Sequence, residues 1–203
     1  MAEDERPSTP EAALAELIAG NQRFVNGTLV HPHQDADHRA ALVQAQRPFA
    51  VVFGCSDSRL AAEIIFDRGL GDLFVIRTAG HIIGAEVLAS IEYGVAVLGA
   101  PLIVVLGHDS CGAIAATEAA VTGACPAPQG LEAIIERVTP SIEYAHSCQI
   151  TDPDEISAVH VRRTVELLVK QGASVGGSVD DGRCAVVGMT YRLADGRVTV
   201  VTD

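Results

Sequence analysis

Short apolar runs alternate with helical segments from residue 49 onward, and this alternation constrains the fold more than any other feature of the chain. Four runs, FAVVF, LFVI, LIVVL and AVVGM, are apolar nearly throughout, which is typical of strands covered on both faces. Strand–helix–strand alternation gives a mostly parallel sheet with right-handed crossovers. A fifth run, RVTVV, follows a turn at Asp195-Gly196 and is expected to form an antiparallel edge strand. The predicted strands are 49–53, 73–76, 102–106, 185–189 and 197–201.

The predicted fold class is therefore α/β, a sheet flanked by helices, preceded by an N-terminal helical arm. The first helix is expected to begin either at Ser8, whose spacing to Glu11 is that of a capping box, or at Thr9 followed by Pro10, and to end at Gly27. Residues 28–48 are expected to form an extended arm. We treat 1–203 as a single domain whose segment 1–48 packs on a neighbouring subunit. Further helices are predicted at 60–67, 84–98, 111–122, 130–147 and 153–171.

Charge and cysteine content exclude several classes of protein. A net charge of −12 repels phosphate backbones, so no nucleic-acid partner is expected. The longest apolar runs are far shorter than the ~20 residues that span a bilayer, so no membrane association is expected. The first ten residues, MAEDERPSTP, lack the apolar segment of a secretory signal. Five cysteines are too few and too scattered for a disulfide framework, which favours the reducing cytoplasm.

Metal-ligating side chains follow two of the predicted strands. Strand 49–53 runs into a turn that contains Cys55, and strand 102–106 runs into a turn that contains His108 and Cys111. Ligands of open α/β sheets gather at the carboxyl ends of strands, so these three side chains converge if the two strands are neighbours. Two thiolates and one imidazole suit zinc, and three protein ligands leave one position open, as in catalytic sites.

The other cysteines and histidines are given structural roles. A cysteine is more often a small buried hydrophobe than a ligand, and Cys125, Cys148 and Cys184 have no polar strand-end setting. The three histidines of the arm are expected to be solvated, and two others to lie on helix surfaces. His81 is expected near the cleft without an assigned role. The arm histidines are His31, His33 and His38, and the helix-surface histidines are His146 and His160.

Four sequence blocks together resemble the β-class carbonic anhydrases. They are CSDSR at 55–59, FVIRTAGH at 74–81, SIEY at 90–93 and GHDSCG at 107–112. The resemblance implies one zinc ion per chain, held by Cys55, His108 and Cys111, and reversible hydration of CO2 to bicarbonate. It also implies a sheet order of 2-1-3-4 and a homo-oligomer, a dimer or a dimer of dimers, embraced by N-terminal helices.

The resemblance further implies an Asp57–Arg59 dyad beside the zinc. Zinc lowers the pKa of bound water, and the resulting hydroxide attacks CO2. Asp57 is then expected to accept the hydroxide's hydrogen, while Arg59 keeps Asp57 ionised and away from the metal. Three alternatives remain open. Asp57 is a helix cap, Asp57 is itself the fourth zinc ligand, or Arg59 is an ordinary ion-paired residue.

Three further residues are expected at the substrate. Gln34 matches a glutamine that donates an amide hydrogen bond near the substrate in plant-type members, and it is expected to enter a neighbour's site. Tyr93 matches a pocket tyrosine, with helix packing as its alternative. The backbone N–H of Gly112 is expected to hold bicarbonate. The chain has no Trp, so the inhibitory bicarbonate site of some members is not expected.

Two other functions stay open at this point. Relatives that hydrolyse carbonyl sulfide or carbon disulfide retain the same constellation of residues. A zinc-bearing scaffold without activity is the alternative from another class, and loss of Asp57 or Arg59 would have favoured it.

Overall fold

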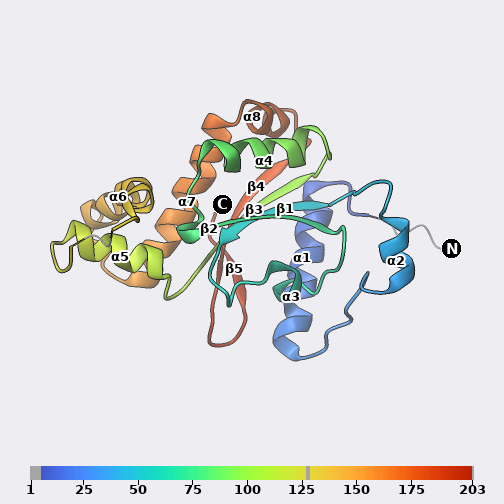
Figure 1. Cartoon of the computed structure of the whole chain (residues 1–203), viewed down its shortest axis with the longest axis horizontal. Coiled ribbons are helices and arrows are strands. Elements are labelled where there is room, and N and C mark those ends of the chain that lie inside the picture. The colour runs from blue at the N-terminus through green and yellow to red at the C-terminus, as the bar shows by residue number, and fades with distance from the viewer. Residues whose placement is uncertain (1–5, 127–128, 203) are drawn as a thin grey trace.

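The computed structural model describes residues 6–126 and 129–202, and its centre is a five-stranded sheet in the order β2-β1-β3-β4-β5 (Figure 1). β1 pairs in parallel with β2 and β3, β3 pairs in parallel with β4, and β5 is antiparallel to β4. The predicted fold class and strand order are confirmed. The strands are β1 (Ala50–Cys55), β2 (Leu73–Thr78), β3 (Leu102–His108), β4 (Ala185–Tyr191) and β5 (Val198–Val200).

Helices cover both faces of this sheet. α4 and α8 lie together on one side in Figure 1, and α5 and α6 form a lobe beside α7. A 3₁₀ turn, η1 (Ala79–His81), follows β2. The helices are α1 (Pro10–Asn26), α2 (Ala36–Ala41), α3 (Ala62–Ile65), α4 (Ala85–Ala96), α5 (Gly112–Val121), α6 (Glu132–Ser147), α7 (Pro153–Gln171) and α8 (Ala173–Asp180).

Alternate residues of each central strand point to opposite faces, so each face of the sheet has its own hydrophobic core. Ala50 and Val52 of β1 pack with residues of α1, α3, α5 and α6. Val51 and Phe53 pack with residues of α4, α7 and α8. β1 and β3 are buried along their whole length, as their apolar sequences predict.

Several element bounds differ from the prediction. β1 and β3 each run two residues further than expected, so Cys55 and His108 are the last residues of strands rather than members of the following turns. α8 was not predicted, because its sequence ASVGGSVD contains two glycines, which are poor helix formers. α2 interrupts the arm that was expected to be extended, and Asp35 caps it by accepting a hydrogen bond from the His38 amide.

α1 has the predicted ends and packs against its own chain. Thr9 caps it, and Gly27 ends it in the left-handed conformation with φ of 67°. Leu17 is fully buried, and a Cβ atom at Gly20 would lie 1.8 Å from the carbonyl oxygen of Phe66, so only glycine permits this close approach. Part of the apolar stripe is thus covered within the chain. Packing of segment 1–48 on a second subunit stays a prediction, and its residues 1–5 lie outside the described part.

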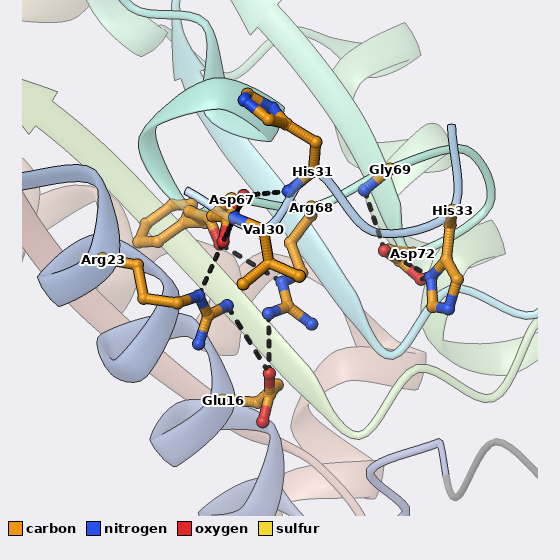
Figure 2. Close-up of polar contacts among 10 residues, drawn as sticks. Glu16, Arg23, Val30, His31, His33, Asp67, Arg68, Gly69 and Asp72 are labelled. Atoms are coloured by element: carbon orange, nitrogen blue, oxygen red, sulfur yellow. Dashed lines mark hydrogen bonds and ion pairs between the residues drawn. The ribbon is translucent and has the colours of Figure 1, made fainter. Parts of the chain in front are cut away.

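A buried aspartate fastens the arm to the body of the protein (Figure 2). The carboxylate of Asp67 accepts hydrogen bonds from Arg23 Nε at 2.6 Å, from the Val30 amide at 3.0 Å and from the His31 amide at 2.9 Å. Burial by itself raises the pKa of Asp67, but these donors and the charge of Arg23 outweigh it and hold the pKa below its ordinary value. One carboxylate therefore ties the arm to α1.

Two arm histidines are also held in place, which corrects the expectation of a solvated arm. His33 Nδ1 lies 2.8 Å from Asp72 Oδ1, and its ring stacks on that of His38 at 4.3 Å. His38 Nε2 donates to the carbonyl oxygen of Leu70 at 3.0 Å. His31 remains exposed, as predicted. The arm follows the surface because carboxylates and carbonyls near 67–72 satisfy its polar groups.

No helix in the described part of the chain is long and apolar enough to cross a membrane.

We predict that Asp67→Ala lowers the free energy of unfolding by about 2–3 kcal/mol, because it leaves a half-buried guanidinium and two amides unpaired. Asp181→Ala is the matched control, since its ion pair with Arg183 is exposed and worth little. Urea unfolding at pH 7 measures both changes. Since the folded pKa of Asp67 is lowered, the cost of Asp67→Ala should shrink as the pH falls below about 4. Equal values for the two variants would show that the contact does not stabilise the fold.

Candidate metal centre

The carboxyl ends of β1 and β3 bring the three predicted ligands together. β1 and β3 are parallel neighbours, with Gly54 of one opposite Leu106 of the other. Cys55 ends β1, His108 ends β3, and Cys111 immediately precedes α5. The ligand atoms of these three residues all lie within 4.8 Å of one another, and the two Sγ atoms are 4.0 Å apart. All three side chains are buried.

The donor atoms fit a zinc ion. His108 Nδ1 donates to the carbonyl oxygen of Asp109 at 2.8 Å, which leaves Nε2 as the acceptor atom. That Nε2 is buried and has no hydrogen-bond partner in the described structure. A metal ion would satisfy it, and the backbone bond to Nδ1 fixes the ring orientation that a ligand needs. Two sulfur atoms beside an imidazole favour zinc over hard cations such as magnesium or calcium.

The three side chains shift one another's pKa values in directions that favour the binding of a cation. The contact with Cys111 lowers the pKa of the Cys55 thiol, and the same contact raises the pKa of Cys111, because a second negative charge so close is unfavourable. Burial lowers the pKa of His108, but the nearby Cys55 sulfur and the backbone bond to Asp109 outweigh it and raise the pKa overall. A cation that displaces the shared protons would relieve this repulsion.

Asp57 and Arg59 form a bidentate ion pair beside the cluster. Arg59 Nε donates to Asp57 Oδ1 at 2.8 Å, and Arg59 Nη2 donates to Oδ2 at 2.7 Å. Hydrogen bonding to Arg59 holds the pKa of Asp57 well below its ordinary value, so the carboxylate is ionised. The helix-cap alternative is wrong, because α3 begins after Ala61 with no side-chain cap. Both carboxylate oxygens are held by Arg59.

Arg77 is a residue of the site that the sequence analysis missed. Its Nε donates to the carbonyl oxygen of Cys55 at 3.0 Å, and its Nη2 donates to that of Asp57 at 2.5 Å. It therefore braces the turn that carries both the first thiol and the acidic member of the ion pair. Its place in the FVIRTAGH block, one of the four blocks that carry the family resemblance, could have identified it as a residue of the site.

The three predicted substrate residues do not lie together in one chain. Gly112 follows Cys111 directly and is exposed at the start of α5. Tyr93 is exposed on α4, packs on Phe74 with ring centroids 6.0 Å apart, and lines a hollow of about 440 Å³ that also contains Gln46. Gln34 lines a separate hollow. Gln46, which the sequence analysis did not consider, is thus the glutamine that accompanies Tyr93.

Two histidines lie buried behind the metal centre. His160 of α7 was predicted on a helix surface, and this is wrong, since it is only 4% exposed. Its ring centroid lies 4.5 Å from that of His81, which is fully buried in η1. His146 is half-buried on α6 and lies 3.5 Å from Glu118, consistent with its predicted surface position. The helical periodicity of the sequence did not distinguish the buried position of His160 from an exposed one, because α7 is buried on more than one side.

The sheet, with two thiols and an imidazole at one of its edges, is an α/β fold that carries a ligand set suited to zinc. The family model for carbonic anhydrase matches residues 50–198. A carbonic anhydrase of Mycolicibacterium smegmatis is 54% identical over 192 residues, which cover 94% of this chain and 93% of that protein. The chain therefore belongs to the β-carbonic anhydrase family, which confirms the resemblance, and zinc is the metal of this family.

Solved structures show the same fold at low sequence identity. The β-carbonic anhydrase CafA of Aspergillus fumigatus has a TM-score of 0.73 at 23% identity, and the match covers 95% of this chain and 91% of that one. A tetrameric β-carbonic anhydrase of Sordaria macrospora has a TM-score of 0.67 at 22% identity, with 94% and 97% covered. The sheet and its helices are thus those of the family.

We predict that Cys55→Ser, His108→Ala and Cys111→Ser each reduce bound zinc from about one ion per chain to nearly none, because each removes one of three ligands. Cys184→Ser is the control, since burial raises the pKa of that thiol to about 11 and it belongs to the core on the other face. Atomic absorption after dialysis measures the metal. One tightly held zinc per chain in the Cys111→Ser protein would overturn the assignment.

Proposed function

We propose that this enzyme interconverts CO2 and bicarbonate at the centre formed by Cys55, His108 and Cys111. The observation that carries the proposal is the buried, unpaired Nε2 of His108 facing two thiols, in a chain of this family. When bound, zinc supplies a Lewis acid that lowers the pKa of a water molecule toward neutrality. Stopped-flow measurement of CO2 hydration by the zinc-loaded protein tests the proposal, and absence of hydration would refute it.

The ionised Asp57 orients the nucleophile. A carboxylate that is held at both oxygens by Arg59 can only accept hydrogen bonds, so it fixes the hydrogen of the attacking water and leaves an oxygen lone pair for CO2. The Arg59 clamp also keeps the carboxylate from turning toward the cation. We expect the backbone N–H of Gly112 to donate to the bicarbonate oxygens, and its position after the second thiol at the start of α5 supports this.

The two other functions are not favoured. A scaffold without activity has no need for the intact ion pair of Asp57 with Arg59. Hydrolysis of carbonyl sulfide or carbon disulfide uses the same constellation, but the close relative is a carbonic anhydrase by name. Comparing CO2 hydration with carbonyl sulfide hydrolysis on the same preparation separates the two substrates. We also propose the cytoplasm as its compartment, because a centre with two unpaired cysteines 4.0 Å apart needs reducing conditions to avoid oxidation.

We further propose that the enzyme works as a homo-oligomer, a dimer or a dimer of dimers. Val43 and Tyr93 are 76% and 45% exposed, and both line the hollow that contains Gln46. Exposed apolar groups clustered with a polar amide are typical of a surface that another subunit covers. Such an arrangement would bring Tyr93, and Gln46 or Gln34 from the arm, to a neighbour's metal centre.

Substitution at this hollow tests the assembly. Val43→Glu should shift the oligomer toward monomer, because it places a charge in a surface that would be buried. Val30→Glu is the control, a valine 67% exposed outside this hollow. Sedimentation velocity measures the result. An unchanged oligomer in the Val43→Glu protein would place the interface elsewhere.

Substitutions of the ion pair test the role of Asp57. Asp57→Asn should retain zinc and lower kcat by about 100-fold, because the amide presents hydrogens where an acceptor is needed. Arg59→Ala should raise the pH of the rising limb of activity by about one unit, since the freed carboxylate competes for the cation until hydroxide is more concentrated. Arg183→Ala is the matched control, because it removes an Asp–Arg pair of the same spacing far from the cluster in sequence. A pH profile of Arg59→Ala that superimposes on the parent would reject this role.

A further inference from the structure

A buried chain of hydrogen bonds links α6 and α7 to the first thiol of the metal centre. Ser141 Oγ lies 2.8 Å from His160 Nδ1, and His160 Nε2 lies 2.9 Å from the carbonyl oxygen of Gly80. The amide N–H of Gly80 in turn donates to Cys55 Sγ at 3.3 Å. Ser141, His160 and Gly80 are all buried. This series of hydrogen bonds therefore runs through buried residues from the helical lobe to the metal-binding sulfur.

The partners fix the tautomer of His160. A carbonyl oxygen only accepts hydrogen bonds, so Nε2 must carry the hydrogen that Gly80 receives. Nδ1 is then the acceptor for the hydroxyl of Ser141. Burial lowers the pKa of His160, which keeps the ring neutral and this arrangement intact. The imidazole thus holds Gly80 by one defined bond, and it is itself oriented by Ser141.

Gly80 needs such support because its conformation is unusual. It has φ of 67°, and the next residue, His81, also has a positive φ, of 40°. A residue other than glycine in this region is strained and is retained only where its surroundings hold it. The ring of His81 packs against Phe53 and against His160, with centroid distances of 6.3 and 4.5 Å. The bond from His160 therefore fixes the turn that aims the Gly80 amide at Cys55.

The same helix holds the second metal-binding strand. Ser157 Oγ donates to the carbonyl oxygen of His108 at 2.9 Å. Ser157 and His160 are three residues apart and so lie on one face of α7. One helix face thereby reaches both ligand-bearing segments: it bonds directly to His108 and reaches Cys55 through Gly80.

We propose that His160 is a positioning residue of the metal centre, which orients Gly80 so that its amide N–H bonds to the Cys55 thiolate. The inference rests on the proposed function, because it concerns the same zinc site. A hydrogen bond to a thiolate draws charge from the sulfur, so the metal keeps more of its positive charge. Partners of this kind change metal affinity or activity by 10–100-fold when removed from other sites.

Cobalt substitution provides a readout that does not depend on activity. With Co²⁺ as the probe, the thiolate-to-metal absorption band reports directly on the sulfur ligands. His160→Leu, which lacks both ring nitrogens, should shift this band. It should also weaken Co²⁺ binding by about 10-fold or more in a chelator competition at pH 7, because without the Gly80 amide the ionised form of Cys55 that binds the metal is less stable relative to the thiol. His160→Gln should restore both values toward the parent, because its amide can donate to Gly80 and accept from Ser141. The rising limb of the pH–activity profile should move upward only in the leucine variant.

Thr164→Val is the matched control on the same helix. Thr164 is equally buried and donates to the backbone carbonyl of His160 rather than to its ring, so the cobalt band should not change. If His160→Leu does not fold, Ser141→Ala provides the test. Loss of the Ser141 hydroxyl allows the His160 ring to adopt the other tautomer, so the cobalt band should shift in the same direction. An unshifted band and unchanged affinity in the folded leucine variant, or in Ser141→Ala, would overturn the proposal. A parent protein without a thiolate band would instead refute the metal site itself.

Discussion

Parallel pairing of β1 with β3 is the constraint on which the metal centre depends. Parallel neighbours end at the same edge of a sheet, so Cys55 and His108 meet although 53 positions separate them in the chain. The tight turn after β3 adds Cys111 before α5 begins. Any slip of one residue between β1 and β3 would point Cys55 to the other face of the sheet. The fully apolar cores on both faces make such a slip costly.

Burial of three titratable groups at this edge requires compensation from the surrounding chain. Two thiols 4.0 Å apart resist double ionisation, and the unpaired Nε2 of His108 is unfavourable in a buried position. Backbone groups offset part of this cost: the carbonyl of Asp109 orients the imidazole, and the amide of Gly80 bonds to Cys55. A divalent cation bound by these three side chains would offset the remaining cost of burying them, so metal binding would also stabilise the fold.

Local patterns in the sequence were sufficient to predict the apolar strands and the metal-ligating residues at their ends. The sheet order that makes those strands neighbours came from the family resemblance, and the structure has this order. The sequence analysis failed for residues whose place depends on distant elements. His160 has the polarity of a surface residue, and its burial follows only from the packing of α6 and η1 around α7. α8 was missed because tertiary contacts override its glycine-rich sequence. The predicted entry of Gln34 into a neighbour's site stays a prediction, and Gln46, which shares the hollow of Tyr93, is a second candidate that its sequence context did not reveal.

The metal ligands are buried, whereas the Asp57–Arg59 pair beside them lies toward solvent, and the two sides of the centre therefore have different roles. The thiols and the imidazole face the core, where α7 and the Gly80 turn hold them rigidly. Arg59 is half exposed, so the charge that holds Asp57 lies toward solvent. Burial lowers the pKa of His81 and His160 behind the centre, so these rings accept protons poorly and the exposed side favours the exit of a proton. Positioning of the metal ligands thus comes from the interior, and orientation of the nucleophile and proton exit belong to the open side.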